Sequence, residues 1–282
     1  MYMTLINDKD RPTLQYLTAD NIHSPKVTAI FATRNGGVSG QAPGTEHLSS
    51  LNFKFDSEGE NSESVAENYR IIAASQGFCA ENFFCLRQAH TDRIIIVDDK
   101  KLSEKRTRYC LNGEADALIT NIKGILLAVR TADCVPILLY DSMNGAVGAV
   151  HAGWRGTFAQ IGAKTVRRMT EIYGTNPADI QAAIGPAIGS CCYEVDVGFY
   201  QQFHKEYGDE INKFFILKSG SKPLCDLKTM NKSFLIESGL SANNIEVSEL
   251  CTMCNPELFF SHRRSGSKRG TMASFIGMNA GL

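Results

Sequence analysis

Cys134 and His151 are the residues whose types and setting point most clearly to chemistry. Cys134 ends the motif Thr131–Cys134, and His151 begins the motif His151–Gly156 directly after an apolar run. An upstream segment offers a second imidazole, His90. Two imidazoles and one thiolate make a three-ligand zinc site with one open position, an arrangement that activates water. Cys134 and His151 would equally form a nucleophile and its base.

Each of these residues also has a purely structural interpretation. A lone cysteine at a strand edge, such as Cys134, is more often buried and inert than catalytic. His151 would then be a hydrogen-bonded core histidine and His90 a loop histidine. The zinc site and the Cys–His pair differ in one respect, because a nucleophile–base pair has no need of His90. A third hypothesis is a non-enzymatic zinc- or copper-binding protein, although a storage or structural site more naturally has four protein ligands.

Asp133, Arg155 and Gln88 extend the candidate site. Asp133 lies between apolar segments, where a carboxylate needs partners, and it is a candidate to orient a ligating imidazole. In the Cys–His alternative, Asp133 or Gln88 would orient His151. Arg155 lies at the start of an expected helix, where its guanidinium and unpaired backbone amides would both favour an anion.

The remaining cysteines give weaker signals. Cys251–Cys254 has the CxxC spacing of zinc sites and redox pairs. There is no second CxxC and no thioredoxin-like context, so we interpret this spacing as a coincidence or a buried pair. The adjacent Cys191 and Cys192 are interpreted in the same way. Nine cysteines are an odd number in a chain of 282 residues, which is too large to need disulfides, and this indicates reduced thiols in a cytoplasmic protein.

Composition and charge argue against several classes of protein. A net charge of −1 provides no general attraction to nucleic acid or to a membrane surface. No apolar run is long enough to span a bilayer, and the N-terminal residues lack a basic region followed by an apolar stretch, so we expect no signal peptide. The basic segment 261–269 is expected to be solvated, with phosphate binding as the alternative.

Apolar runs predict a chain rich in strands. Several runs are continuously apolar, as expected when both faces of a sheet are covered. The candidate strands are Val27–Thr33, Arg93–Val97, Ala117–Thr120, Ile125–Arg130, Val135–Tyr140, Ala146–His151, Ile180–Ile184, Phe214–Lys218, Ile245–Leu250, Leu258–Ser261 and Met272–Ile276.

Helical periodicity and capping residues predict four helices. A capping box at Ser64–Glu67 opens a helix that should end at Gly77, and helices from Phe158, Val197 and Leu227 should end at Gly174, Gly208 and Gly239. Some neighbouring strands are separated by turn residues alone, so antiparallel pairs are mixed with helical crossovers. The sequence therefore predicts a mixed α/β (α+β) fold, a layered sandwich of mixed β-sheets flanked by helices. No Pro/Gly/Ser-rich linker divides it, which favours one domain over residues 1–282.

Several motifs together resemble one known family, the YfiH/YlmD family. Its members are the laccase-domain, or DUF152-type, purine nucleoside phosphorylases. The resemblance runs in matching order from about residue 27 to the C-terminus, and the TADC and HAGWRG elements are the most specific part of it. The matching motifs are Thr33–Ser39, Asp116–Thr120, Thr131–Pro136, Ala149–Gly156, Gly185–Val195 and Phe259–Arg264.

The resemblance implies a single α/β domain, similar in fold to the toxin deamidases of the CNF type, with a zinc held by two histidines and one cysteine. Carried over to this chain, the ligands are His90, Cys134 and His151, with zinc preferred over copper. Cys134, His151, Asp133 and Arg155 are the predicted catalytic residues, and Arg34, Gln88 and Arg155 are predicted to bind substrate.

The implied activity is phosphorolysis of adenosine, inosine, guanosine and methylthioadenosine, together with adenosine deamination. The partners would be a nucleoside and phosphate, with no nucleic acid or membrane, in a cytoplasmic monomer or homodimer. The alternatives are a cytoplasmic hydrolase that edits peptidoglycan precursors, or a metal-free Cys–His hydrolase. An older label for the family, multicopper polyphenol oxidase, is set aside because six histidines are too few for a multicopper cluster and its supports.

Overall fold

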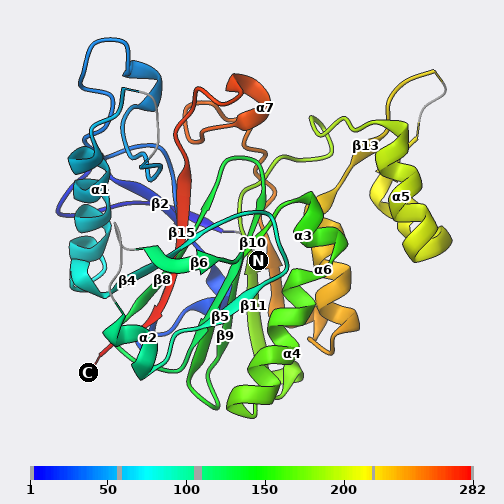
Figure 1. Ribbon diagram of the computed structural model, residues 1–282, viewed down its shortest axis with the longest axis horizontal. Helices are drawn as coiled ribbons and strands as arrows, with labels where there is room; N and C mark the ends of the chain where they lie inside the picture. The colour runs from blue at the N-terminus through cyan, green and yellow to red at the C-terminus, as the bar shows by residue number, and fades with distance from the viewer. Residues whose placement is uncertain (1–2, 56–58, 105–109, 218–219, 281–282) are drawn as a thin grey trace.

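Two β-sheets pack face to face between two layers of helices. The structure is a computed structural model that describes residues 3–55, 59–104, 110–217 and 220–280 (Figure 1). In spatial order, one sheet contains β1 (Thr4–Asn7), β2 (Gln15–Thr18), β3 (Val27–Ala32), β15 (Met272–Met278), β8 (Leu126–Thr131), β4 (Phe83–Arg87) and β6 (Cys110–Glu114). The other contains β14 (Ile245–Val247), β11 (Ile180–Ile184), β9 (Val135–Asp141), β10 (Ala146–Ala152), β7 (Ala117–Thr120) and β5 (Ile94–Ile96).

Both sheets mix strand directions. In the six-stranded sheet, the four central strands, β11, β9, β10 and β7, pair with one another in antiparallel fashion. The two edge strands pair in parallel, β14 with β11 and β5 with β7. In the seven-stranded sheet, β4 runs parallel to both β8 and β6. The chain passes from one sheet to the other between β8 and β9, and this link carries the TADC motif. The predicted mixed α/β sandwich is confirmed.

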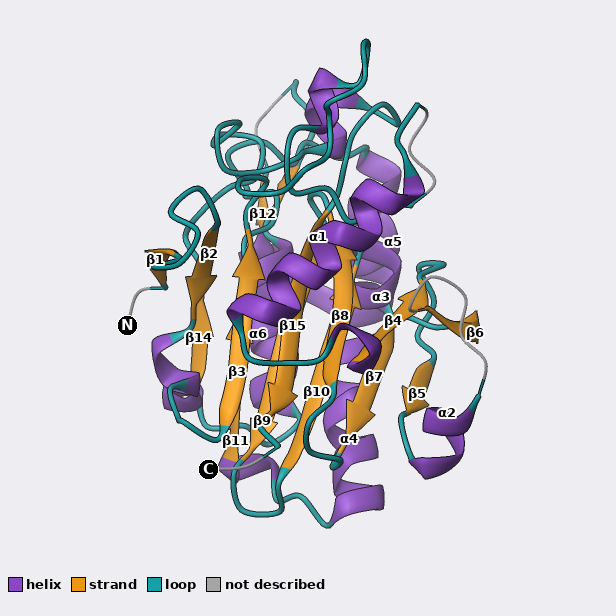
Figure 2. Ribbon diagram, turned by 90° about the vertical axis from the view of Figure 1, so that its left-hand side faces the viewer, coloured by secondary structure: helices purple, strands orange, loops and turns teal. Residues whose placement is uncertain are grey.

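Helices cover the outer face of each sheet (Figures 1 and 2). α1 (Ser62–Ser75) lies on the seven-stranded sheet, and α3 (Trp154–Phe158), α4 (Ile161–Tyr173) and α6 (Leu227–Glu237) lie on the opposite side of the molecule. The other elements are α2 (Asp99–Ser103), α5 (Val197–Tyr207), α7 (His262–Ser265) and a two-stranded pair, β12 (Phe215–Ile216) with β13 (Leu224–Cys225). Among the described residues, no helix combines the length and the apolar character needed to cross a membrane.

The apolar core follows from the alternation of side chains along strands that are buried on both faces. In β9, Ile137 and Leu139 pack with the helices, whereas Leu138 and Tyr140 point to the other sheet. All seven residues of β9 are buried. This is why the strand appears in the sequence as a continuous apolar run instead of an alternating one.

Two of the predicted helices begin at other residues than the sequence predicts. α1 begins before the predicted capping box because Asn61 is the N-cap, and its side chain accepts a hydrogen bond from the amide of Glu63 (3.0 Å). The helix predicted from Phe158 is interrupted at Gln160, whose φ of 55° separates α3 from α4. The ends of the helices agree with the glycine signals at Gly174 and Gly208.

One predicted strand, Leu258–Ser261, is wrong. Phe259 and Phe260 are buried, which explains the apolar run, but the segment has no partner strand in the described part of the chain. Its carbonyls are used elsewhere, since that of Leu258 accepts from the amide of Arg34 (2.8 Å). The strand predicted at Phe214–Lys218 is reduced to β12, and Lys218 lies outside the described residues. The unpredicted strands, β1, β2, β4, β6 and β13, have two to five residues, too few for a period of two to be recognised.

Shortening Leu138 to alanine should destabilise the fold strongly, because the side chain is 0% exposed between the two sheets. We expect Leu138→Ala to lower the free energy of unfolding by about 2–5 kcal/mol. Leu217→Ala is the matched control, since Leu217 is 53% exposed and its substitution should cost about 0.5 kcal/mol or less. Urea titrations of both variants measure the difference, and equal losses would contradict the assigned core.

Candidate metal centre

Three segments that are far apart in the sequence meet at one end of the two sheets. His90 lies in the loop after β4, Cys134 in the link from β8 to β9, and His151 near the end of β10. The Sγ atom of Cys134 lies 3.9 Å from Nε2 of His90, and the two imidazole centroids are 5.0 Å apart. One ligand atom from each residue lies within 4.8 Å of the others. The structure thus brings together the three residues that the sequence analysis names as metal ligands.

The backbone around these residues is unusual in two places. The φ angle is 59° at His90 and 93° at Asp133, a region that costs non-glycine residues on the order of 1–3 kcal/mol each. Such conformations persist only where surrounding contacts enforce them. Gly153, the N-cap of α3, lies close to two of the candidate ligands, His90 and Cys134. A Cβ atom there would be 2.9 Å from Cδ2 of His90 and 3.1 Å from Sγ of Cys134.

Asp116, directly before β7, positions both imidazoles. Its carboxylate accepts hydrogen bonds from Nδ1 of His151 (2.7 Å) and from the amide of His90 (3.1 Å). It also accepts from the amide and the hydroxyl of Thr91 (2.6 and 2.8 Å) and from the amide of Ala89 (3.3 Å). Because Nδ1 of His151 donates to this carboxylate, Nε2 is left to bind a metal, which is the usual arrangement around a ligating histidine.

Neighbouring charges shift the pKa values of these groups. Burial opposes ionisation of the Cys134 thiol, but the His151 and His90 imidazoles outweigh it and lower its pKa to about 6. Burial would lower the pKa of His151, whereas Cys134 and Asp116 raise it to about 9. Burial also raises the pKa of Asp116, but its bonds from His151 and Thr91 prevail and lower that pKa to about 2. The thiolate form of Cys134, the form that binds metals, is therefore favoured.

The donor set fits zinc. Two imidazole nitrogens and one thiolate are ligands that zinc prefers, and three protein ligands are typical of a catalytic zinc with one open position. The short mutual distances between the donors allow a single ion to contact all three. The same geometry contains the Cys–His pair of the alternative hypothesis, with Asp116 as the group that orients His151.

A cavity of about 300 Å³ opens next to the three candidate ligands. His90 and Cys134 form part of its lining. Its apolar wall consists of Trp154, Ile188, Tyr193 and Leu227. Three guanidinium groups also line it, those of Arg155, Arg263 and Arg269. This combination suits a small molecule with an aromatic part and an anionic part.

Asp133 lines this cavity but does not orient an imidazole, contrary to the hypothesis from the sequence. Its carboxylate accepts from the hydroxyls of Thr252 (2.5 Å) and Ser261 (3.0 Å) and from the amide of Arg263 (2.7 Å). These bonds tie the TADC turn to two later loops of the chain. The orienting role belongs to Asp116, for which the sequence analysis gives no role. The sequence does contain a signal for Asp116, because its carboxylate lies between two alanines at the start of an apolar strand, where it needs hydrogen-bond partners.

The three predicted substrate-binding residues have different surroundings. Arg155 is exposed, lines the cavity and stacks on the Trp154 ring at 4.2 Å, and its guanidinium has no hydrogen-bond partner among the described residues. Arg34 lies outside this cavity and donates to the carbonyls of Ser49, Pro256 and His47. Gln88 bonds both backbone groups of Arg130 on β8. The substrate-binding roles of Arg34 and Gln88 stay predictions.

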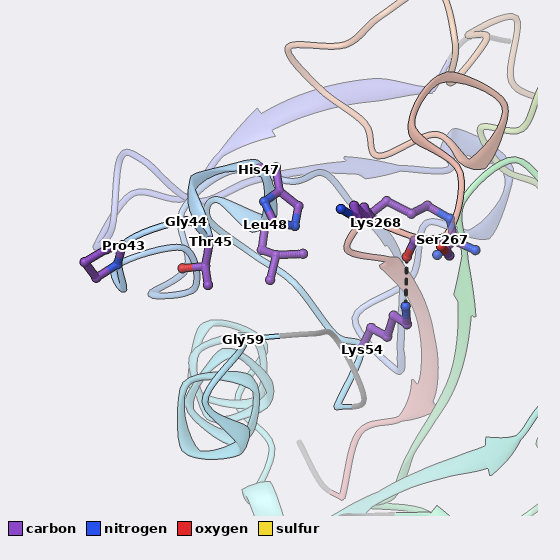
Figure 3. Close-up of a pocket in the computed structure, with 10 residues that line it drawn as sticks. Pro43, Gly44, Thr45, His47, Leu48, Lys54, Gly59, Ser267 and Lys268 are labelled. Carbon is purple, nitrogen blue, oxygen red and sulfur yellow. Dashed lines mark hydrogen bonds between the residues drawn. The ribbon is translucent and has the colours of Figure 1, made fainter.

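The basic segment 261–269 borders two cavities. Arg263 and Arg269 line the cavity beside the candidate metal ligands, and Nε of Arg269 is buried without a hydrogen-bond partner in the described part of the chain. A second cavity, of about 430 Å³, shares Arg269 and includes Lys54 and Lys268 (Figure 3). The ammonium of Lys54 donates to the carbonyl of Ser267 (3.2 Å), which the dashed line in Figure 3 marks.

Comparisons with known proteins agree with this architecture. The family model "Multi-copper polyphenol oxidoreductase laccase" matches residues 28–279. The chain is 37% identical over 261 residues to "Purine nucleoside phosphorylase YlmD" of Bacillus subtilis (strain 168), covering 92% of this chain and 91% of that protein. It is 34% identical over 247 residues to "Adenosine deaminase RL5" of an unknown prokaryotic organism, covering 86% and 91%. A crystal structure of Bacillus licheniformis hypothetical protein YfiH superposes with a TM-score of 0.85 at 36% identity, covering 98% and 99% of the two chains.

Gly153 provides a test of the metal centre that leaves every ligand in place. We expect Gly153→Ala to lose one metal ion per chain, because the added Cβ would press on His90 and Cys134. Gly198→Ala, which adds a Cβ with no atom within 4 Å, is the matched control and should keep its metal. Elemental analysis of protein purified without a histidine tag measures the metal content. Full metal content in Gly153→Ala would contradict this expectation and show that the centre tolerates the added Cβ.

Proposed function

The chain belongs to the family described as multi-copper polyphenol oxidoreductase laccase, and we propose that it is a purine nucleoside phosphorylase that also deaminates adenosine. One observation carries the proposal. A centre of two imidazoles and one thiol opens into a cavity that has both an aromatic wall and guanidinium groups. The aromatic wall suits the base of a purine nucleoside, and the guanidinium groups suit phosphate.

Phosphorolysis places specific demands on the cavity. An oxygen of phosphate attacks C1′ of the ribose and the bond from C1′ to N9 breaks. The electron pair of that bond leaves with the purine, which takes up a proton. Trp154 and Tyr193 hold the base between aromatic faces. The guanidinium of Arg155 binds two phosphate oxygens with its planar fork.

Zinc is the metal that we assign to His90, Cys134 and His151. When bound, it would supply a Lewis acid that polarises an oxygen or nitrogen of the substrate and lowers the pKa of water. The description of the family names copper, but the described residues contain only two groups of potential ligands, and one of them has no histidine. With six histidines in the whole chain, a multicopper oxidase centre has little support.

Deamination of adenosine is the second activity that we assign to the same cavity. The relative named as an adenosine deaminase covers about as much of this chain, at a similar identity, as two of the relatives named as phosphorylases. In this reaction water attacks C6 of the purine and ammonia leaves, so no phosphate is needed. The cytoplasm is the location that we assign to both reactions, in keeping with the free thiols of the described cysteines.

His90 distinguishes the zinc enzyme from the Cys–His hydrolase. We expect His90→Ala to abolish both activities together with metal binding at this centre, because the variant has only two of the three ligands. A Cys–His pair would keep its activity, since Cys134, His151 and Asp116 are unchanged. His204→Ala is the control, because His204 is only partly buried on α5, away from the centre, and its imidazole hydrogen-bonds Asp209. Nucleoside turnover is measured for both variants, and an active His90→Ala protein without metal would overturn the zinc assignment.

Arg155 distinguishes phosphorolysis from deamination. The rate on inosine should depend on phosphate, with ribose 1-phosphate and free hypoxanthine as products. Arg155→Lys keeps the charge but loses the planar fork. We therefore expect it to raise the KM for phosphate more than the KM for nucleoside, and to affect adenosine deamination less than phosphorolysis.

The matched control for Arg155→Lys is an arginine away from the cavity. Arg168→Lys makes the same exchange on α4, where the arginine pairs with Glu171 at the surface, and it should change neither reaction. Equal losses of both activities in Arg155→Lys would show that Arg155 supports the structure of the site and does not bind phosphate. Inosine cleavage that is independent of phosphate would contradict the phosphorylase assignment itself.

A further inference from the structure

Four cysteines from two loops converge beside the wall of the cavity. Cys191 and Cys192 lie between β11 and α5, and Cys251 and Cys254 lie in a turn between β14 and α7. Their sulfur atoms all lie within 4.8 Å of one another. The Sγ atom of Cys254 is 3.6 Å from that of Cys191 and 3.3 Å from that of Cys192. In the sequence each pair has the features of a coincidence or a buried pair, whereas the fold joins the two pairs into one group.

The spacing of the sulfur atoms resembles the edges of a coordination tetrahedron. Zinc–sulfur bonds of about 2.3 Å place the four sulfurs of a tetrahedral site about 3.8 Å apart. A disulfide requires about 2.05 Å, which is much shorter than the separations seen here. A set of four sulfur ligands selects zinc or an iron–sulfur centre.

Backbone amides are directed at one of these sulfurs. The amide of Gly189 donates to Sγ of Cys251 (N to Sγ 3.2 Å), and the amides of Met253 and Cys254 also interact with it. Amides that point at a sulfur favour its thiolate, and hydrogen bonds to ligand atoms are typical of metal sites. The turn at Cys251–Cys254 therefore provides two thiols at a suitable spacing and also backbone amides that stabilise a thiolate.

A buried cation, Lys228, lies near this group. Lys228 on α6 is 6% exposed, and its ammonium donates to the carbonyls of Ser248 and Leu250 (3.1 Å for Leu250). Cys251 and Cys191 are close enough to interact electrostatically with it. A buried ammonium needs negative charge nearby. Four thiolates around one divalent ion carry two negative charges, which Lys228 would partly compensate.

We infer that Cys191, Cys192, Cys251 and Cys254 form a second metal centre, a structural zinc site separate from the centre at His90, Cys134 and His151. Binding replaces the four thiol protons by one zinc ion and releases them to solvent. All four positions around the metal are filled by protein, so this site holds structure and has no place for substrate.

The position of the site shows what it would hold in place. Tyr193 of the cavity wall follows Cys192, and the guanidinium of Arg263 donates to the carbonyls of Cys192 and Glu194 (3.3 and 2.9 Å). Thr252, inside the CxxC turn, donates to Asp133 (2.5 Å). The metal would therefore fasten together the two loops that shape one wall of the cavity.

Zinc content per chain, measured in protein purified under reducing conditions without a histidine tag, tests this inference. We expect two zinc ions in the unsubstituted protein, one in Cys254→Ser and one in His90→Ala, with none in the double variant. Cys254 is exposed, so serine is accommodated there, and Cys79→Ser, at an exposed cysteine outside the group, is the matched control that keeps both ions. Loss of zinc in Cys254→Ser but not in Cys79→Ser supports the site even if the first centre proves to be metal-free.

Three results would overturn the inferred zinc site. They are an unchanged zinc content in Cys254→Ser, iron with acid-labile sulfide in the protein, or a disulfide within the four-cysteine group under reducing conditions. A second measurement does not depend on the folding of a cysteine variant. The His90→Ala protein, stripped of metal and titrated with Co²⁺, should develop the absorption of cobalt in a tetrahedral all-thiolate site. Absence of this spectrum would also overturn the inference.

Discussion

Five hydrogen bonds converge on the buried carboxylate of Asp116. Four come from the loop at 89–91 and one from the imidazole of His151. Because one carboxylate fixes both the loop that carries His90 and the ring of His151, the separation of the two imidazoles is set by a single group. The dependence is mutual, since a buried carboxylate without such partners would be strongly unfavourable. The loop at 89–91 and the His151 imidazole therefore stabilise the Asp116 carboxylate that holds them in position.

The passage of the chain between the two sheets explains why the centre forms at this place. β8 and β9 belong to different sheets, so residues 132–134 must turn sharply from one to the other. The φ of 93° at Asp133 is part of that turn, and the bonds from Thr252 and Ser261 to its carboxylate hold it there. The turn leaves Cys134 between the ends of the sheets, where His151 on the adjacent strand can approach it.

The sequence was sufficient for features that depend on residue type or local period. His90, Cys134 and His151 could be proposed as metal ligands because few types of side chain bind metals and because the motifs around them resemble a known family. The sandwich could be predicted from apolar runs and glycine stops. Features that depend on distant contacts could not be found. Asp116 takes its role from a loop more than twenty residues earlier and from pairing with β10, and each cysteine pair gives only a weak signal until the parallel approach of β11 and β14 brings both together. The need of a carboxylate between apolar segments for partners points to Asp133 in the sequence, but it applies equally to Asp116, and only contacts between distant segments distinguish the two.

The bond from Thr252 to Asp133 links the neighbour of Cys251 to the neighbour of Cys134, so the four-cysteine group and the imidazole centre share one network. Loops are where local opening is least costly, because few buried contacts oppose it. The cavity wall is made largely of such loops, whereas β9 and β10 behind it are fully buried. A metal that joins two of these loops would add little to the stability of so large a core. Its effect would be to keep Tyr193 and Arg263 in place, and thus to fix the shape of the cavity rather than the fold.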